Sequence, residues 1–218
     1  MTIRIALIDD QSLFRSGVKV VLDAQDDMEV VGEASDGREG LELIRATAPD
    51  VVLLDMRMPG MDGVATTAEL FGPTWDGPLP RVIVLTTFAL DQAAASAVRR
   101  GASGFLLKDA TPAFLCASIR AVHSGSSVIA PNELTQLLSP TVERAPAPPA
   151  PEGYRQLTER ELVIFGLAAR GLSNAEIASL VFASESTVKT HVGAILRKLG
   201  LRDRVQIVVF AHEHGLAG

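Results

Sequence analysis

The sequence predicts an α/β domain with a doubly wound five-stranded parallel sheet, followed by a small all-α domain of four helices. Through the first 125 residues, short apolar runs alternate with longer amphipathic stretches, the pattern of a parallel sheet covered by helices. Residues 139–152 (SPTVERAPAPPAPE) hold five prolines, which favour an extended linker because proline removes a backbone donor and fixes φ. We therefore expect domains at 1–127 and 153–218, joined by a linker at 128–152.

Five apolar runs predict the strands of the first domain. They are continuous rather than alternating, as expected for strands buried on both faces. The predicted strands are 3–8, 28–32, 51–54, 81–85 and 104–107, and helices are expected near 12–24, 37–48, 63–71, 91–100 and 111–124. In such sheets the binding site lies beyond the carboxyl ends of the strands, where the strand order reverses.

Helix start and stop signals divide the second domain. Thr158 with Glu161 three residues later forms a capping box, and the helix that it opens ends at Gly171. Further helices are expected after Ser173, from Ser184 to Gly200, and over 202–213.

Charge and composition narrow the class of protein. The formal net charge is −6, and the acidic excess lies wholly before residue 152, which argues against a uniformly basic nucleic-acid binder. The single cysteine, Cys116, excludes an intrachain disulfide and fits a reducing compartment. No apolar run approaches the roughly 18 residues of a membrane span, so we expect a cytoplasmic protein without a membrane partner.

Polar residues stand at the ends of four predicted strands. Asp9 and Asp10 follow the first strand, Asp55 the third, Thr86 the fourth and Lys108 the fifth. Clustered carboxylates need a cation, and Mg²⁺ suits them because it also accepts phosphate oxygens. An aspartate can accept a phosphoryl group, which a lysine and a hydroxyl can then contact. One such aspartate alone would more often be a helix cap, but the whole set favours a phosphoryl site.

Several motifs make residues 3–125 resemble the receiver domain of two-component response regulators, which has a flavodoxin-like fold. They are IDDQ at 8–11, LLDMRMPGMDG at 53–63, VLTTF at 84–88 and GFLLKD at 104–109. The resemblance implies that Asp55 accepts the phosphoryl group of a sensor histidine kinase and that Lys108 binds it. It further implies Thr86 and Phe105 as switch residues, and Mg²⁺ bound by Asp9, Asp10, Asp55 and the Met56 carbonyl. Without the resemblance, Phe105 would be interpreted as a core residue.

Residues 173–200 have the layout of a helix-turn-helix. A short helix, a turn at Phe182-Ala183 and a longer helix follow one another, and the longer helix would enter the major groove of DNA. Between 188 and 205, Asp203 is outnumbered by five basic residues, a pattern suited to phosphate contact: Lys189, Arg197, Lys198, Arg202 and Arg204. A plain helical bundle with a basic solvated face is the alternative.

The stretch 157–210 also resembles the LuxR-type domain of the NarL/FixJ subfamily. The similar motifs are LTERE at 157–161, GLSNAEIA at 171–178, STVKTHV at 186–192 and KLGLRDR at 198–204. The resemblance implies that Lys189 and Thr190 face DNA bases. Five more residues are expected to contact phosphate, cap the helix or pack, and they are Glu185, Thr187, His191, Lys198 and Arg202. Gly193 departs from relatives that carry a long basic residue there, which leaves the base code open.

We interpret the chain as a transcription factor under phosphorylation control rather than an enzyme. The last helix would pair two copies into a homodimer on a near-palindromic operator, and phosphorylation would promote both pairing and binding. Lys189→Ala is expected to lose affinity for DNA, and Lys198→Ala to weaken binding and its salt dependence. Three alternatives stay open: an aspartyl-phosphate phosphatase or phosphotransferase, a DNA-binding protein whose receiver has lost phosphorylation, and a regulator triggered by a ligand.

Overall fold

The computed structural model of the chain describes residues 2–87, 92–125 and 151–216. The chain divides into two compact units, Met1–Val128 and Ile129–Gly218. Most of the predicted linker 128–152 lies outside the described residues. Within those residues, no helix has both the length and the apolar character that a membrane crossing requires.

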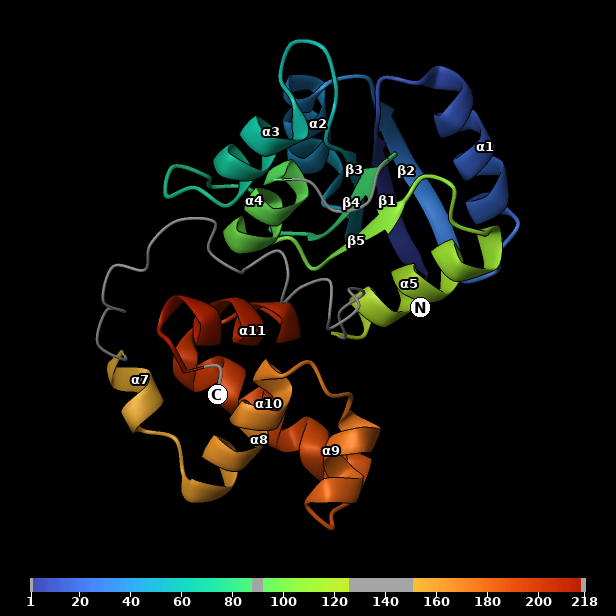
Figure 1. Cartoon of the computed structure of the whole chain (residues 1–218). Coiled ribbons are helices and arrows are strands. Elements are labelled where there is room, and N and C mark those ends of the chain that lie inside the picture. The colour runs from blue at the N-terminus through green and yellow to red at the C-terminus, as the bar shows by residue number, and fades with distance from the viewer. Residues whose placement is uncertain (1, 88–91, 126–150, 217–218) are drawn as a thin grey trace. The chain divides into compact units, whose positions relative to one another are not determined.

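The first unit is the predicted five-stranded parallel sheet with helices on both faces (Figure 1). Its elements follow in the order β1 (Ile3–Ile8), α1 (Ser12–Asp23), β2 (Met28–Ala34), α2 (Gly37–Thr47), β3 (Val51–Asp55), α3 (Gly63–Leu70), β4 (Arg81–Thr86), α4 (Gln92–Arg100), β5 (Gly104–Leu107) and α5 (Pro112–His123). The strand order is β2-β1-β3-β4-β5, and all pairs are parallel. The order therefore reverses at β1 and β3, where the fold opens its binding crevice.

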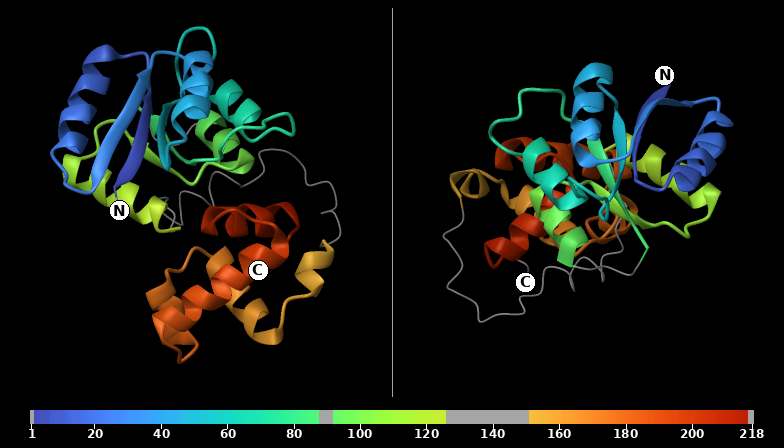
Figure 2. Two further views of the ribbon diagram at one scale, coloured as in Figure 1. Left: turned by 180° about the vertical axis from the view of Figure 1, so that it is seen from behind. Right: turned by 90° about the horizontal axis from the view of Figure 1, so that it is seen from above.

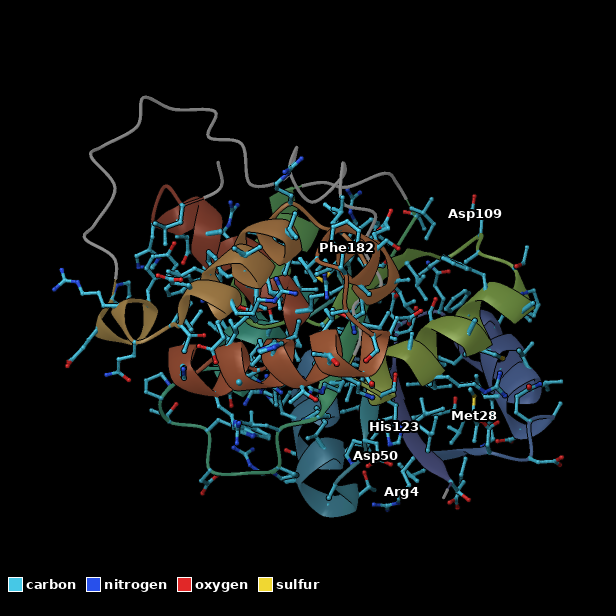
Figure 3. All side chains as sticks on the ribbon, turned by 90° about the horizontal axis from the view of Figure 1, so that it is seen from below. Arg4, Met28, Asp50, Asp109, His123 and Phe182 are labelled. Carbon is cyan, nitrogen blue, oxygen red and sulfur yellow. The ribbon has the colours of Figure 1, made fainter. Side chains whose placement is uncertain are left out.

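Apolar side chains of the strands pack against α1 and α5 in the core of this unit. Leu22 of α1 and Ile119 of α5 are fully buried, and Cys116 belongs to the same cluster. At the amino-terminal edge of the sheet, the backbone N–H of Arg4 donates to Asp50 Oδ2 over 2.9 Å (Figure 3). These contacts fix β1 beside β3, and thereby fix the residues that follow both strands.

The second unit has five described helices, one more than the sequence indicates. They are α7 (Glu152–Arg155), α8 (Glu159–Ala169), α9 (Asn174–Leu180), α10 (Glu185–Leu199) and α11 (Arg204–Glu213). The additional helix is the single turn α7, which no capping or periodicity signal announces. Tertiary packing stabilises it, because the Tyr154 ring lies edge-on to Phe165 at a centroid distance of 5.1 Å.

Helices α8 to α11 gather around one apolar core (Figure 2). The predicted capping box of α8 is present: Glu161 Oε2 accepts from the Thr158 backbone N–H, and Thr158 Oγ1 accepts from that of Glu161. Ser173 and Glu176 form a second box at α9, and Gly200 ends α10 in the left-handed conformation. The predicted helical boundaries in this unit are therefore close to the observed ones.

Candidate functional site

The five polar residues expected at strand ends all lie at the carboxyl edge of the sheet. Asp9 directly follows β1, Asp55 is the last residue of β3, Thr86 is the last of β4, and Lys108 directly follows β5. Asp9, Asp55 and Thr86 are buried, whereas Asp10 is exposed. The fold thus brings together groups from four parts of the chain at its topological switch point.

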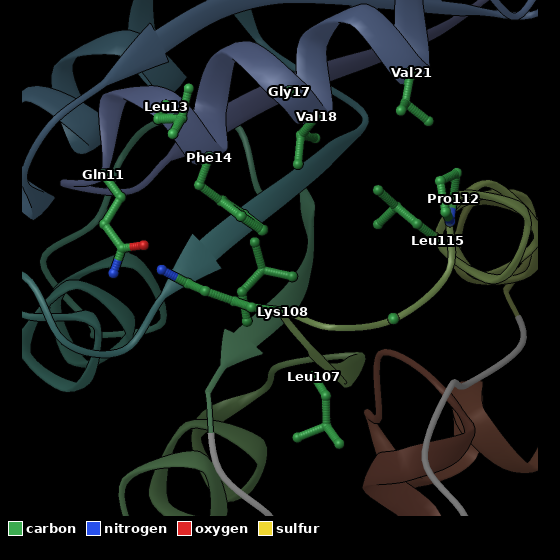
Figure 4. A pocket seen from close by; sticks show the side chains of 12 residues that line it. Gln11, Leu13, Phe14, Gly17, Val18, Val21, Leu107, Lys108, Pro112 and Leu115 are labelled. Atoms are coloured by element: carbon green, nitrogen blue, oxygen red, sulfur yellow. The ribbon is translucent and has the colours of Figure 1, made fainter.

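Lys108 joins the two buried carboxylates. Its Nζ lies 2.7 Å from Asp9 Oδ2 and 2.9 Å from Asp55 Oδ2. The lysine backbone N–H donates to the Thr86 carbonyl over 2.8 Å, which fixes the end of β5 to the end of β4. Its ammonium group also lies 4.9 Å from the centre of the Phe14 ring, at one end of a groove of about 450 Å³ between α1 and α5 (Figure 4).

The charges in this pocket favour the binding of a cation. Burial raises the pKa of Asp9, and the nearby Asp55 charge adds to that effect, although hydrogen bonds from Lys108 and the Gln11 backbone oppose it. Burial alone would lower the pKa of Lys108, but its hydrogen bonds to Asp9 and Asp55 outweigh burial and raise it. The lysine therefore stays charged and only partly compensates the acidic cluster.

The donor set fits a hard divalent cation. Carboxylate oxygens of Asp9, Asp10 and Asp55 all lie within 4.8 Å of one another. Asp9 Oδ2 is buried and lies 2.7 Å from Lys108 Nζ. The Met56 carbonyl accepts a hydrogen bond from the Gly63 backbone N–H over 3.3 Å, and its second lone pair allows a further partner. All these donors are oxygens, the ligands that Mg²⁺ prefers.

Two residues that support the pocket were not predicted. A Cβ on Gly63 would lie 2.4 Å from the Asp55 carbonyl oxygen, so only glycine lets α3 begin this close to β3. The Arg15 guanidinium donates to the Asp9 carbonyl oxygen and pairs with Glu33 at 3.3 Å. Neither contact has a sequence signature, because each joins a side chain or Cα position to the backbone of another element.

Phe105 lies in β5 opposite Val84 and is 8% exposed. Its burial agrees with a core position, and its place one strand from Thr86 also agrees with the switch role that the resemblance implies.

The second unit contains the predicted helix-turn-helix in α9 and α10. Ser184 caps α10 by accepting from the Thr187 backbone N–H over 3.1 Å. Lys189 and Thr190 are exposed on α10, as are Glu185 and Thr187, while His191 is half-buried. In the turn, Phe182 has φ 53° and is 97% exposed, which places an apolar ring beside the helix that would meet DNA.

The five basic residues that the sequence groups together have different surroundings. Lys189 and Arg197 are exposed, and Arg202 is half-buried. Lys198 Nζ donates to Glu161 Oε2 over 2.6 Å and to the Gln156 carbonyl over 3.1 Å. Arg204 donates to Asn174 Oδ1 over 2.7 Å and to the Leu172 carbonyl, which fixes the start of α9. Lys198 and Arg204 therefore hold helices together within the unit.

The fold and the two sites define a class of protein: a receiver with an acidic strand-end pocket, joined to a helix-turn-helix domain. Comparisons with known proteins agree. Residues 5–120 match the family described as response regulator receiver domain, and residues 155–211 match bacterial regulatory proteins of the luxR family. The chain belongs to the two-component response regulators with a LuxR-type DNA-binding domain, which are transcriptional regulators.

Individual relatives cover nearly the whole chain. The uncharacterized transcriptional regulatory protein YxjL of Bacillus subtilis is 40% identical over 98% of this chain and 97% of its own length. The transcriptional regulatory protein LiaR of the same organism is 39% identical over 98% of this chain and 99% of its own length. The crystal structure of the response regulator ChrA of a heme-sensing two-component system is 37% identical, with a TM-score of 0.51 over 99% of this chain and 98% of that one. These regulators are not classical enzymes, although receiver domains carry phosphoryl-transfer chemistry.

Proposed function

We propose that Asp55 accepts a phosphoryl group from the phosphohistidine of a sensor histidine kinase, and that this modification promotes dimerisation and operator binding in the cytoplasm. The observation that carries the proposal is the position of Lys108 Nζ, within 3 Å of both Asp9 and Asp55 at the switch point of the sheet. Residues 128–152 would link the receiver to the DNA-binding domain.

The carboxylate of Asp55 would be the nucleophile. A bond forms between its oxygen and phosphorus as the phosphorus–nitrogen bond to the donor histidine breaks, and the leaving imidazole takes up a proton. Asp55 Oδ1 accepts from the Arg57 backbone N–H over 3.2 Å, and Oδ2 accepts from Lys108, so both oxygens are held in place. Lys108 would then pair with the phosphoryl oxygens.

Asp9, Asp10, Asp55 and the Met56 carbonyl would hold Mg²⁺ in this pocket. The ion, when bound, neutralises the carboxylates and the incoming phosphoryl oxygens. The raised pKa of Asp9 supports this assignment, because a buried carboxylate that is costly to ionise gains most from a cation.

Phosphorylation would then shift the receiver between two states. The modification adds roughly two negative charges and strong acceptor oxygens. The Thr86 hydroxyl would turn toward them, and the Phe105 ring would fill the space left behind. Phe105 has no phenolic hydroxyl, so the change depends on ring burial alone.

In the second unit, α10 would read the major groove through Lys189 and Thr190. Glu185, Thr187, His191 and Arg202 would contact phosphates, cap the helix or pack, and α11 would join two copies on a near-palindromic operator. The exposure of Lys189 and Thr190 near the start of α10 supports this orientation. Lys189→Ala should therefore lower the affinity for a duplex that the wild-type chain selects from a random pool.

The phosphorylation proposal is tested by labelling the full chain with a small phosphodonor and Mg²⁺. Asp55→Asn should abolish labelling measured by intact mass. Asp109→Asn is the matched control, because Asp109 is an exposed aspartate that follows the same edge of the sheet, and it should label like wild type. Undiminished labelling of Asp55→Asn would refute the assignment.

A further inference from the structure

The last turn of α10 is held by three residues from three segments, which we call the α10 clamp: Gln156, Glu161 and Lys198. Gln156 follows α7, Glu161 lies in the first turn of α8, and Lys198 is the penultimate residue of α10. Lys198 Nζ lies 2.6 Å from Glu161 Oε2 and 3.1 Å from the Gln156 carbonyl oxygen. The clamp therefore ties the end of the reading helix to the start of the domain.

Glu161 makes the lysine costly to remove. Its side chain is 7% exposed, against 32% for that of Lys198. The carboxylate also accepts from the Thr158 backbone N–H over 2.7 Å, so its position is fixed by the capping box of α8. If Lys198 moved to a DNA phosphate, the buried carboxylate of Glu161 would lose the ammonium group that it contacts, and that loss would cost free energy.

The backbone of α7 packs on the same turn of α10. A Cβ on Gly153 would lie 2.3 Å from the Lys198 carbonyl oxygen, so the two backbones are in direct contact. The Tyr154 ring, which packs on Phe165 and Phe210, fixes α7 to α8 and α11. The clamp thus continues an interface that already orients the end of α10.

We propose that Lys198 is a positioning residue, which orients α10 through Glu161 and Gln156 rather than by contacting DNA phosphate. This proposal rests on the proposed DNA binding and changes the role of one residue within it. Arg197, the preceding residue, is exposed on α10 and serves as the matched cationic control.

The experiment uses the full chain, a duplex that wild type selects from a random pool, and an unrelated duplex, with Kd measured across salt concentrations. Lys198→Met keeps the apolar stem, and Glu161→Gln keeps an acceptor for the capping box. Each substitution should weaken binding to the selected duplex by about tenfold, and the double variant should bind no more weakly than either single variant. Binding to the unrelated duplex, and the dependence of affinity on salt concentration, should stay unchanged. If Arg197 contacts phosphate, Arg197→Ala should lower the slope of log affinity against log salt concentration by about one. It should also weaken binding to both duplexes alike.

Glu161→Gln separates the two roles most sharply. If Lys198 were a phosphate ligand, freeing it from Glu161 would leave affinity unchanged or increase it, and Lys198→Met would lower the salt slope by about one. Either result overturns the proposal, as does a Lys198→Met variant that binds like wild type. Melting temperatures measured on the same samples confirm that each variant is folded at the temperature of the binding assay.

Hydrogen exchange without DNA tests the clamp independently of the proposed function. Backbone amides of residues 196–200 should exchange faster in Lys198→Met and Glu161→Gln, and at the wild-type rate in Arg197→Ala. Unchanged exchange rates in Lys198→Met and Glu161→Gln would overturn the proposal that the α10 clamp holds the end of α10. Failure of wild type to select any duplex would instead count against the proposed DNA binding, and the exchange rates would still decide the role of Lys198.

Discussion

Each unit of this response regulator sets a lysine against buried carboxylate, but the two lysines differ in charge balance. In the receiver, the Lys108 side chain is 7% exposed and faces both Asp9 and Asp55, with Asp10 close by. In the DNA-binding unit, the Lys198 side chain is 32% exposed and contacts the single carboxylate of Glu161. The receiver pocket keeps an excess of negative charge that a cation can relieve, whereas the second pair is balanced. The site that we propose to respond is therefore the one with unbalanced buried charge, and the balanced pair is the one that we propose to be structural.

Removal of Lys108 from the receiver should therefore lower the free energy of unfolding by more than removal of Lys198 from the DNA-binding unit. Lys108→Met leaves two buried carboxylates without their shared cation, and we expect the free energy of unfolding of the receiver to fall by about 3 kcal/mol in a chelating buffer. Lys198→Met should cost only about 1 kcal/mol in its own unit, since that side chain is a third exposed. Urea titration followed by fluorescence of Trp75, the single tryptophan, reports the receiver, and helical circular dichroism reports both units. Equal losses of unfolding free energy in the two variants would contradict the difference in charge balance between the two lysine contacts.

The acidic pocket also depends on a close backbone approach at Gly63. Gly63→Ala places a Cβ 2.4 Å from the Asp55 carbonyl and 2.8 Å from the Met56 Cα, so α3 must shift. We expect a loss of about 2 kcal/mol in receiver stability, measured by the same Trp75 titration. Gly17→Ala in α1 is the control, because nothing lies within 4 Å of its added Cβ, and it should stabilise by up to about 1 kcal/mol. Similar effects at both positions would show that the approach at Gly63 is unimportant.

Replacement of Asp9 is expected to give the smallest change in receiver stability, and this change is a gain rather than a loss. Its pKa is raised by burial and by Asp55, so the folded state binds its proton more tightly than the unfolded state does. Without a divalent cation, receiver stability should therefore fall as pH rises above the ordinary aspartate range, and the whole cost is present at neutral pH. Asp9→Asn should raise stability at pH 7 and remove stabilisation by Mg²⁺. Melting curves at several pH values, with and without Mg²⁺, check both effects; a destabilised variant that still responds to Mg²⁺ would contradict them.

Sequence patterns predicted the receiver more fully than the DNA-binding unit. Strands of a parallel sheet end at a common edge, so five residues at strand ends were expected to converge, and they do. The single-turn helix α7 was not predicted, because tertiary contacts such as the packing of Tyr154 on Phe165 stabilise it. The particular partners of Lys198 and Arg204 were also not predicted, since each contacts a residue 30 or more positions away. Net charge along a segment does not show which basic side chains bind other parts of the same domain.

The most direct test of phosphorylation control is the affinity of the full chain for its selected duplex, measured with and without a small phosphodonor in Mg²⁺. Wild type should bind more tightly after treatment and sediment as a dimer, whereas Asp55→Asn should show one unchanged affinity under both conditions. An equal increase in both proteins, or no increase in wild type that is labelled at Asp55, would contradict control of DNA binding through this aspartate.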